Sequence, residues 1–384
     1  MKDTPFGRDV ILILIASFFY MACVMLVNPL IAGFAGDLGA SAALMGLIGG
    51  LTNICSLFCR PFVGNLADTV SKYKLALVGI VLMVASCGCY VLASSPVVVI
   101  LARLVNGVGY ACCSVCLSTW MSNLLPREKI GSGMGLYGTV NALSAAVAPA
   151  VGVAVYERVG YRAAFAVATV SAAMTALLLQ FVKDRGLPVR QSSRSGRLEL
   201  AEPRAVPIAL IIMLFSMPYC ATQTFLVSYL EALALPLSAS LFFPVYAAML
   251  LLLRLSLRSQ FDKKPFAFFM LLCSASALLS IWLLAWARNY PVLFLAAIFM
   301  AGGYGLMCSV SQSTAILLAG PERRGLANGT YYIGLDLGMA LGPILGGVLY
   351  GGLPIAAFYP VLSLAVPAGL LVFWFSRRIL AGAR

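Results

Sequence analysis

The stretch PFAFFMLLCSASALLSIWLLAWA, residues 265–287, contains no charged residue, although Lys263 and Lys264 precede it and Arg288 follows it. An α-helix needs about 20 apolar residues to cross a hydrocarbon core of about 30 Å. Within lipid, a helix also satisfies its own backbone hydrogen bonds. The composition and length of this stretch therefore predict a transmembrane helix.

Similar apolar stretches fill most of the chain. Of its 384 residues 62% are hydrophobic and only 10% are charged, whereas soluble domains carry about 25% charged residues. A water-soluble fold could not bury this much apolar surface, so we expect an all-α polytopic membrane protein. The first stretch is too long for a signal peptide and lacks its cleavage site. Twelve spans are predicted near residues 10–35, 42–63, 74–93, 96–119, 131–155, 161–182, 205–231, 236–257, 265–287, 290–318, 325–350 and 354–376.

The basic residues predict an orientation in the membrane. The chain has 26 Lys and Arg against 13 Asp and Glu, a formal net charge of +13. Of the 26, 22 fall at the termini or in alternate loops, and the other loops hold only Arg158, Arg162 and Arg288. The positive-inside rule then places both termini in the cytoplasm. This rule accounts for the net positive charge, so the charge does not indicate binding of nucleic acid. We expect a protein of the bacterial inner membrane.

The two halves of the chain repeat each other at a constant offset of 194 residues. Six spans, an even number, separate equivalent positions, so the halves share one topology, as in alternating-access carriers. The predicted domains are two six-helix bundles, 1–182 and 205–384, joined by a cytoplasmic linker, 183–204. The matching pairs include Arg60 with Arg254, Asp68 with Asp262, Tyr110 with Tyr304, Gly131 with Gly325, and Pro149 with Pro343.

Residues 64–68, GNLAD, resemble the G-x-L-a-D loop of the major facilitator superfamily. The resemblance covers essentially the whole chain and implies a cytoplasmic gate, in which Asp68 faces a helix N-terminus and basic neighbours. A carboxylate is stabilised there by about 0.3–1 kcal/mol. Thr69 and Ser71 depart from the family pattern, and an ordinary loop with a solvated Asp is the alternative. The gate candidates are Arg60, Gly64, Asp68, Lys72, Arg254 and Asp262.

A second motif, residues 338–347, matches the family pattern G-x-x-x-G-P-x-x-G-G. The family's twelve-helix drug:proton antiporter branch usually carries it in the fifth helix, where this chain has only a degraded copy. Small residues allow close helix packing and proline allows a bend, which suits any carrier but favours antiport here. The packing candidates are Pro149, Gly152, Gly338, Gly342, Pro343, Gly346 and Gly347.

Residues 103–110, RLVNGVGY, resemble another family segment, R-x-x-q-G-x-G. An intramembrane arginine is costly and indicates a transport pathway; alternatively, Arg103 snorkels to headgroups or fixes backbone carbonyls. The resemblance implies a cavity lined by the first, fourth, seventh and tenth spans. Neutral polar and aromatic side chains there suit an amphipathic ligand, although each could serve a helix–helix hydrogen bond. The cavity candidates are Tyr20, Asn28, Arg103, Asn106, Tyr110, Tyr219, Gln223, Tyr229, Tyr304, Gln312, Asn328 and Tyr332.

Asp336 is the carboxylate nearest the middle of a predicted span. Asn328, Tyr332 and Asp336 are spaced four residues apart, which puts the three on one helix face. Desolvation favours the neutral carboxyl, so that proton uptake and release both become feasible. Asp336 is therefore the candidate for proton coupling, and a permanently paired structural carboxylate is the alternative.

Together these features favour a secondary active transporter that works by alternating access and couples protons to efflux of small amphipathic organic molecules. The alternative is an uptake symporter or facilitator for a small organic anion or metabolite, with Arg103 as counter-charge. The chain has no histidine, no close carboxylate pair and no nucleotide motif, so an enzyme is disfavoured. We expect no cofactor and no metal, and a monomer that contacts membrane lipid.

Overall fold

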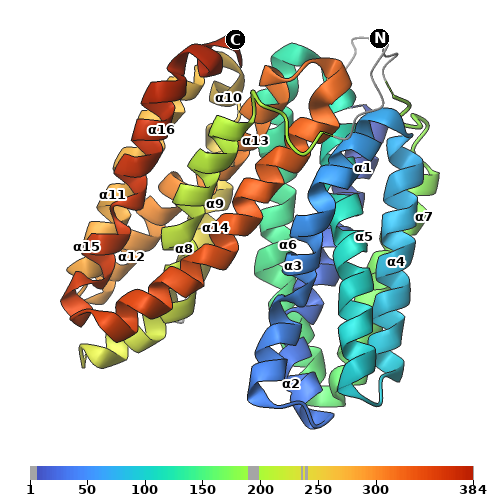
Figure 1. The fold of residues 1–384 in the computed structure, drawn as a ribbon, viewed down its shortest axis with the longest axis horizontal. Helices are drawn as coiled ribbons and strands as arrows, with labels where there is room; N and C mark the ends of the chain where they lie inside the picture. Colours follow the sequence, from blue (N-terminus) through green and yellow to red (C-terminus); the bar gives the residue numbers. More distant parts are fainter. Residues whose placement is uncertain (1–6, 189–198, 235–236, 238–240, 384) are drawn as a thin grey trace. The chain divides into compact units, whose positions relative to one another are not determined.

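The computed structural model describes residues 7–188, 199–234, 237 and 241–383, and within these ranges its regular elements are helices (Figure 1). Residues 189–198 of the predicted linker and the start of the span predicted at 236 lie outside the described residues. The helices are α1 (Arg8–Val27), α2 (Ile31–Asp37), α3 (Ala42–Thr69), α4 (Lys72–Leu92), α5 (Pro96–Asn123), α6 (Ile130–Val159), α7 (Tyr161–Gln180), α8 (Val206–Ala232), α9 (Phe242–Ser256), α10 (Gln260–Lys263), α11 (Phe266–Ala285), α12 (Tyr290–Met300), α13 (Leu306–Leu318), α14 (Arg324–Gly352), α15 (Phe358–Leu362) and α16 (Ala365–Leu380).

Short turns of tighter or wider helix connect several of these elements. A π-helical turn, η3 (Ala301–Gly305), joins α12 to α13. The 3₁₀ turns η1 (Arg127–Lys129) and η4 (Pro321–Arg323) precede α6 and α14. Two others, η5 (Ile355–Ala357) and η6 (Ala381–Ala383), flank the last two helices.

The prediction of an all-α membrane protein is confirmed. Over the described residues, 11 helical stretches are long and apolar enough to cross a membrane, and α9 is a shorter apolar helix. The first predicted span, 10–35, is two helices, because the chain turns at residues 28–30. Pro29 in this turn has no backbone N–H with which to continue α1.

The prediction that residues 64–68 form a loop is wrong, because α3 continues as a helix to Thr69. Arg60 and Arg254, near the ends of the predicted spans 42–63 and 236–257, lie inside α3 and α9 with relative exposures of 0% and 6%. Hydropathy marks only the apolar part of a helix. It misses the polar turns that extend beyond the hydrocarbon core when other helices cover them.

The described contacts form two compact units. Unit 1 comprises Met1–Pro126, Val140–Leu200 and Pro321–Gly329, and unit 2 comprises Arg127–Thr139, Ala201–Gly320 and Thr330–Arg384. Within unit 1, α1 packs on α7, and α5 packs on α3 and α4 (Figure 1). Within unit 2, α11 packs on α12 and α8 on α16. The division into bundles 1–182 and 205–384 stays a prediction.

The glycines of the second motif bring α14 against α8. A Cβ at Gly342 would lie 2.6 Å from the carbonyl oxygen of Met217, and one at Gly346 would lie 2.9 Å from the ring of Phe225. A Cβ at Gly347 would meet only ordinary contacts, the nearest at 3.6 Å. In the degraded copy on α6, a Cβ at Gly152 would lie 2.9 Å from the α1 backbone. Both copies therefore act as helix contacts.

This packing predicts a difference between neighbouring glycines. Gly342→Ala should lower the thermal unfolding midpoint in detergent, because the new methyl group meets backbone of α8 that cannot rotate away. Overpacking of this kind costs about 1–3 kcal/mol. Gly347→Ala is the matched control and should have the same thermal unfolding midpoint as the wild type. Equal midpoints for the two variants would contradict the assigned contact.

The expected orientation can be tested at described positions. Single cysteines at Lys183 and Arg378 should resist a membrane-impermeant thiol reagent in intact cells, whereas one at Arg288 should react, because the positive-inside rule puts the first two in the cytoplasm. The background is a variant stripped of its 11 native cysteines. Reaction at Lys183 from outside would reverse the orientation.

Candidate functional site

Asp68 binds the N-terminus of a helix far away in the sequence. Its two carboxylate oxygens accept hydrogen bonds from the amide groups of Gly325 (2.7 Å) and Leu326 (2.9 Å), at the start of α14. The first amide groups of a helix have no partner within the helix. The helix dipole also favours a negative charge there. Asp68 is 3% exposed, so this is a buried, charge-assisted contact.

Asp262 makes the equivalent contact in the second half. One of its oxygens accepts from the amide of Ser132 (2.7 Å), at the start of α6, and the other lies 3.8 Å from Nζ of Lys129. The offset of 194 relates Asp68 to Asp262 and Ser132 to Leu326. The sequence repeat is thus also a repeat in hydrogen bonding. We call these two contacts, Asp68 with Gly325 and Leu326 and Asp262 with Ser132, the carboxylate clamps.

Glycines make the carboxylate clamps sterically possible. A Cβ at Gly325 would lie 2.8 Å from Oδ1 of Asp68, and one at Gly131 would lie 2.9 Å from Oδ1 of Asp262. At Gly64 a Cβ would come within 3.1 Å of the backbone of Leu326. The approach of each carboxylate to its helix therefore depends on a missing side chain.

The two repeat-related arginines are buried beside the clamps' helices. Arg60 donates from Nη1 to Oγ of Ser114 (2.6 Å), and its guanidinium lies 5.4 Å from the ring centre of Tyr110. Arg254 donates from Nη2 to the carbonyl of Gly305 (2.9 Å) and from Nη1 to the carbonyl of Gly138. Arg254 thus links α9 to α6 and to the π-helical turn.

Lys72, the remaining gate candidate, holds the chain that follows α7. It is 2% exposed, its amide donates to the carbonyl of Gly186 (2.8 Å), and its Nζ donates to the carbonyl of Leu187 (3.5 Å). These bonds fasten the start of the linker to the start of α4. A role for Lys72 in gating stays a prediction.

A stacked pair of tyrosines occurs in each half, and one member of each pair is related by the repeat. The rings of Tyr20 and Tyr110 are stacked with centres 6.0 Å apart, and those of Tyr219 and Tyr304 with centres 4.1 Å apart. Tyr110 and Tyr304 are related by the offset of 194. Tyr304 lies in the π-helical turn, a feature frequent at functional sites. We call these two pairs the tyrosine stacks.

Sequence reasoning missed a further member of the second stack. The ring of Tyr246, on α9, lies 5.2 Å from that of Tyr219. The sequence feature that could have identified Tyr246 is its apolar surroundings. Apart from Arg254, it is the only polar side chain in α9 before the terminal Ser256. An aromatic hydroxyl in such a span needs a polar neighbour.

The stripe along α14 makes separate contacts. Asn328 donates to Oγ1 of Thr119 (3.0 Å) in unit 1, and Gln312 donates to the hydroxyl of Tyr332 (3.1 Å) in unit 2. Asp336, one turn further along α14, is 5% exposed. Two of the predicted cavity residues, Gln312 and Tyr332, are therefore in contact.

Arg103 and its neighbours bind other helices of unit 1. Arg103 donates to the carbonyls of Ile48 (2.9 Å) and Gly49 (2.5 Å) and to Oδ1 of Asn28 (3.4 Å). Asn106 donates to Ser86 (2.8 Å). Hydrogen bonds of this kind, to backbone carbonyls and between helices, are the structural alternative to a transport role for these residues.

The last two cavity candidates also differ from each other. Tyr229 donates to the carbonyl of Ala285 (3.4 Å), and its ring packs edge-on against Tyr359 at 4.6 Å. Gln223 is exposed on α8. In the part of the chain that the structure describes, no group of three or more Cys, His, Asp or Glu could hold a metal ion.

Apolar helices of membrane length, with carboxylates bound to helix ends and polar side chains buried between helices, indicate a polytopic membrane protein. The model of the Major Facilitator Superfamily matches residues 13–320 and 256–381, and the chain belongs to this superfamily. Its members are transporters, not enzymes, and they bind small-molecule substrates.

Similar proteins extend over nearly the whole chain. An uncharacterized MFS-type transporter of Burkholderia pseudomallei is 25% identical, covering 96% of this chain and 92% of its own. The uncharacterized transporter YhhS of Escherichia coli is 22% identical over 89% of this chain and 86% of its own. A bacterial homologue of the iron transporter ferroportin, solved in an outward-facing state, has a TM-score of 0.79 at 13% identity. The match covers 97% of this chain and 99% of that one. The fold of this structure is therefore that of the superfamily.

Proposed function

We propose that this transporter is a secondary active carrier that works by alternating access and exchanges protons for small amphipathic organic molecules, in the direction of efflux. The observation that carries the proposal is the pair of carboxylate clamps, related by the sequence repeat. Each clamp joins a helical carboxylate from one half of the sequence to a helix start from the other half.

The strength of the clamps suits a reversible step. A hydrogen bond to a charged group contributes about 1.5–3 kcal/mol. Conformations separated by a few kcal/mol exchange readily, and a ligand can shift their populations. Clamps formed by one or two such bonds are strong enough to close one side of a carrier. They are weak enough to open again within each transport cycle.

The tyrosine stacks support the proposed substrate class. Aromatic rings with polar hydroxyl tips offer flat apolar faces and hydrogen-bond partners together. The Gln312–Tyr332 pair, which lies in unit 2 like the second stack, adds a neutral amide. Groups of these kinds suit amphipathic, ring-containing molecules better than small charged ones.

Asp336 is the proposed coupling group, because it is a carboxyl buried along α14, 5% exposed, and a carboxyl can take up and release a proton. The alternative, uptake of a small organic anion, depends on Arg103 as counter-charge. The three hydrogen bonds of Arg103 to Ile48, Gly49 and Asn28 favour efflux over this alternative, since its guanidinium already has partners.

Ligand-induced thermal stabilisation of the purified protein tests the substrate class. Amphipathic aromatic compounds should raise the unfolding midpoint, because a ligand at 100 times its Kd adds about 2.7 kcal/mol to stability. Tyr304→Ala should abolish this shift, and Tyr290→Ala, at the start of α12, should retain it. A shift confined to small carboxylates would support the anion carrier instead.

A further inference from the structure

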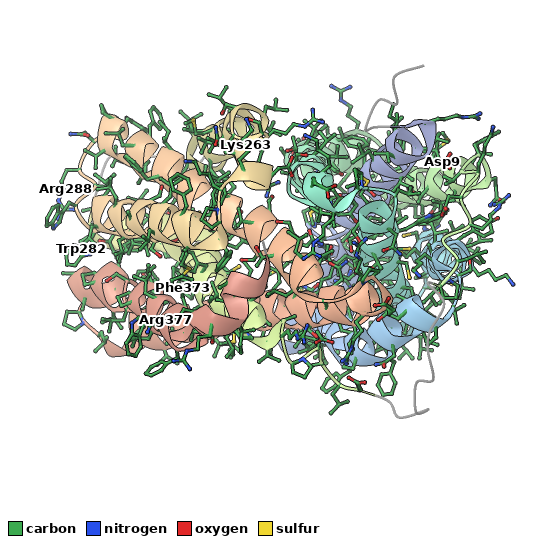
Figure 2. The ribbon with its side chains drawn as sticks, turned by 90° about the horizontal axis from the view of Figure 1, so that it is seen from above. Asp9, Lys263, Trp282, Arg288, Phe373 and Arg377 are labelled. Atoms are coloured by element: carbon green, nitrogen blue, oxygen red, sulfur yellow. The ribbon has the colours of Figure 1, made fainter. Side chains whose placement is uncertain are left out.

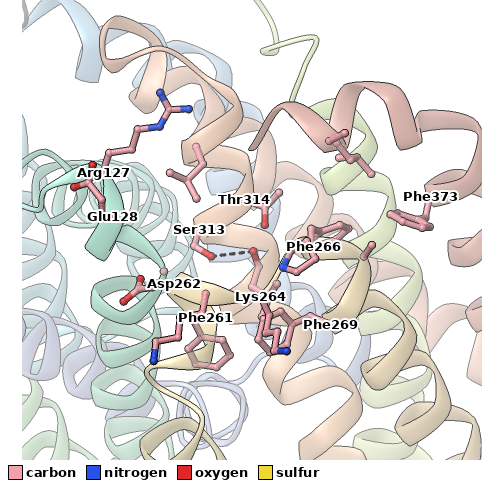
Figure 3. Close-up of a pocket in the computed structure, with 18 of the residues that line it drawn as sticks. Arg127, Glu128, Phe261, Asp262, Lys264, Phe266, Phe269, Ser313, Thr314 and Phe373 are labelled. Atoms are coloured by element: carbon pink, nitrogen blue, oxygen red, sulfur yellow. Dashed lines mark hydrogen bonds between the residues drawn. The ribbon is translucent and has the colours of Figure 1, made fainter. Parts of the chain in front are cut away.

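A cavity of about 890 Å³ opens in unit 2, at the ends of helices where basic residues gather (Figure 3). Its walls come from the segment before α6, from α10 and α11, from α13 and from the end of α16. The floor is apolar and rich in phenylalanine, with two hydroxyls, and charged side chains surround the opening. The lining includes Phe266, Phe269, Phe373, Lys263, Lys264 and Arg377.

The rim of the cavity carries an excess of positive charge. Four basic side chains line it against two acidic ones, Glu128 and Asp262, and the carboxylate of Asp262 is bound to Ser132 and Lys129. Lys263 and Lys264 on the α10 side are exposed, as is Arg377 on α16. Within the described ranges, none of these three has a carboxylate within ion-pair distance. The rim therefore has positive charge to offer an anion.

Two basic side chains of the rim lie over exposed aromatic rings. Nζ of Lys264 lies 5.4 Å above the ring of Phe268, and the guanidinium of Arg377 lies 5.5 Å from the ring of Trp374. Both rings are exposed, at 43% and 56%. Exposed aromatics under basic side chains are typical of the membrane interface, where the cations extend toward the headgroups. Figure 2 labels Arg377 with its neighbour Phe373, which lines the cavity.

We propose that this cavity binds an acidic membrane phospholipid. The headgroup binds at the basic rim, to which Lys263, Lys264 and Arg377 contribute, and the first part of an acyl chain rests on Phe266, Phe269 and Phe373. Basic pockets between helix ends on the cytoplasmic side are suited to anionic headgroups. A soluble anion would leave the phenylalanine floor exposed to water, which favours an amphiphile. The proposal does not depend on the transported substrate.

The test uses the full-length protein purified in a neutral detergent. Short-chain phosphatidylglycerol is titrated while the thermal unfolding midpoint is followed, and phosphatidylcholine and glycerol 3-phosphate are titrated in parallel. The wild type should be stabilised by phosphatidylglycerol alone. K264Q/R377Q should require a roughly thirtyfold higher concentration for the same shift, given the usual contribution of a basic residue near an anionic surface.

The control variant K183Q/R378Q loses the same charge, and Arg378 is the neighbour of Arg377 but does not line the cavity. It should respond as the wild type does. Stabilisation by phosphatidylcholine or by glycerol 3-phosphate to the same extent would overturn the lipid proposal, as would equal responses of the two double variants. If K264Q/R377Q elutes as misfolded protein, the single variant K263Q replaces it, and an unchanged response of K263Q would then overturn the proposal.

Discussion

Replacing Asp68 with asparagine should reduce transport at least roughly tenfold while the protein still inserts, folds and binds its ligand. Asparagine keeps one acceptor oxygen but loses the charge and the second acceptor, so the bonds to Gly325 and Leu326 weaken. Losing one charge-assisted bond costs about 1.5–3 kcal/mol, which shifts a two-state equilibrium roughly 10- to 100-fold. The variant should therefore leave the state in which this clamp is closed.

The repeat supplies an internal comparison for this prediction. Asp262→Asn should have a smaller effect, because Asp262 accepts one amide hydrogen bond where Asp68 accepts two. Glu157→Gln, an exposed carboxylate on α6, is the control and should transport normally. Transport is measured in proteoliposomes and ligand binding by thermal stabilisation. Normal transport by Asp68→Asn would refute the gating role, and loss of folded protein would make Asp68 structural.

Replacing Asp336 with asparagine should abolish accumulation driven by a pH gradient but leave substrate–substrate exchange intact. Exchange requires no net proton movement, so it survives the loss of a proton carrier. Asp336 is 5% exposed on α14, away from bulk water. Asparagine resembles a protonated carboxyl in shape and hydrogen bonding, and so it preserves the structure while removing the group that would carry the proton.

Three outcomes of this experiment differ in meaning. Loss of both accumulation and exchange would identify Asp336 as a structural carboxylate. Loss of binding for cationic compounds alone would identify it as a counter-charge for the substrate. Asp37→Asn, at the exposed end of α2, is the control and should behave as the wild type does. Only the selective loss of gradient-driven accumulation supports proton coupling.

Hydropathy and the repeat predicted the fold, because the cost of burying polar backbone in lipid leaves few alternatives to helices. The family resemblance implied that Asp68 faces a helix N-terminus, and it does, at Gly325 and Leu326. What hydropathy could not predict is the helical end of α3, since those turns lie beyond the apolar segment. Their helical form depends on tertiary contacts such as the clamp at Gly325.

The candidate cavity was harder to predict for a physical reason. A polar side chain on an apolar helix must find some partner, and the sequence does not reveal whether that partner is a ligand or another helix. Arg103 and Asn106 bind α3 and α4, whereas Tyr219 and Tyr304 stack on each other. No motif marks Tyr246 as a neighbour of Tyr219, because its position depends on how α9 packs against α12 and the π-helical turn.

The most direct test of proton-coupled exchange is the proton movement that substrate itself causes. Proteoliposomes containing a pH-sensitive dye receive a stabilising compound from the thermal panel, with no gradient imposed. The wild type should show a proton flux opposite in direction to the substrate, and Asp336→Asn should show none while it still exchanges labelled substrate. Substrate transport by the wild type without any proton flux, or an undiminished flux in Asp336→Asn, would contradict the proposed mechanism.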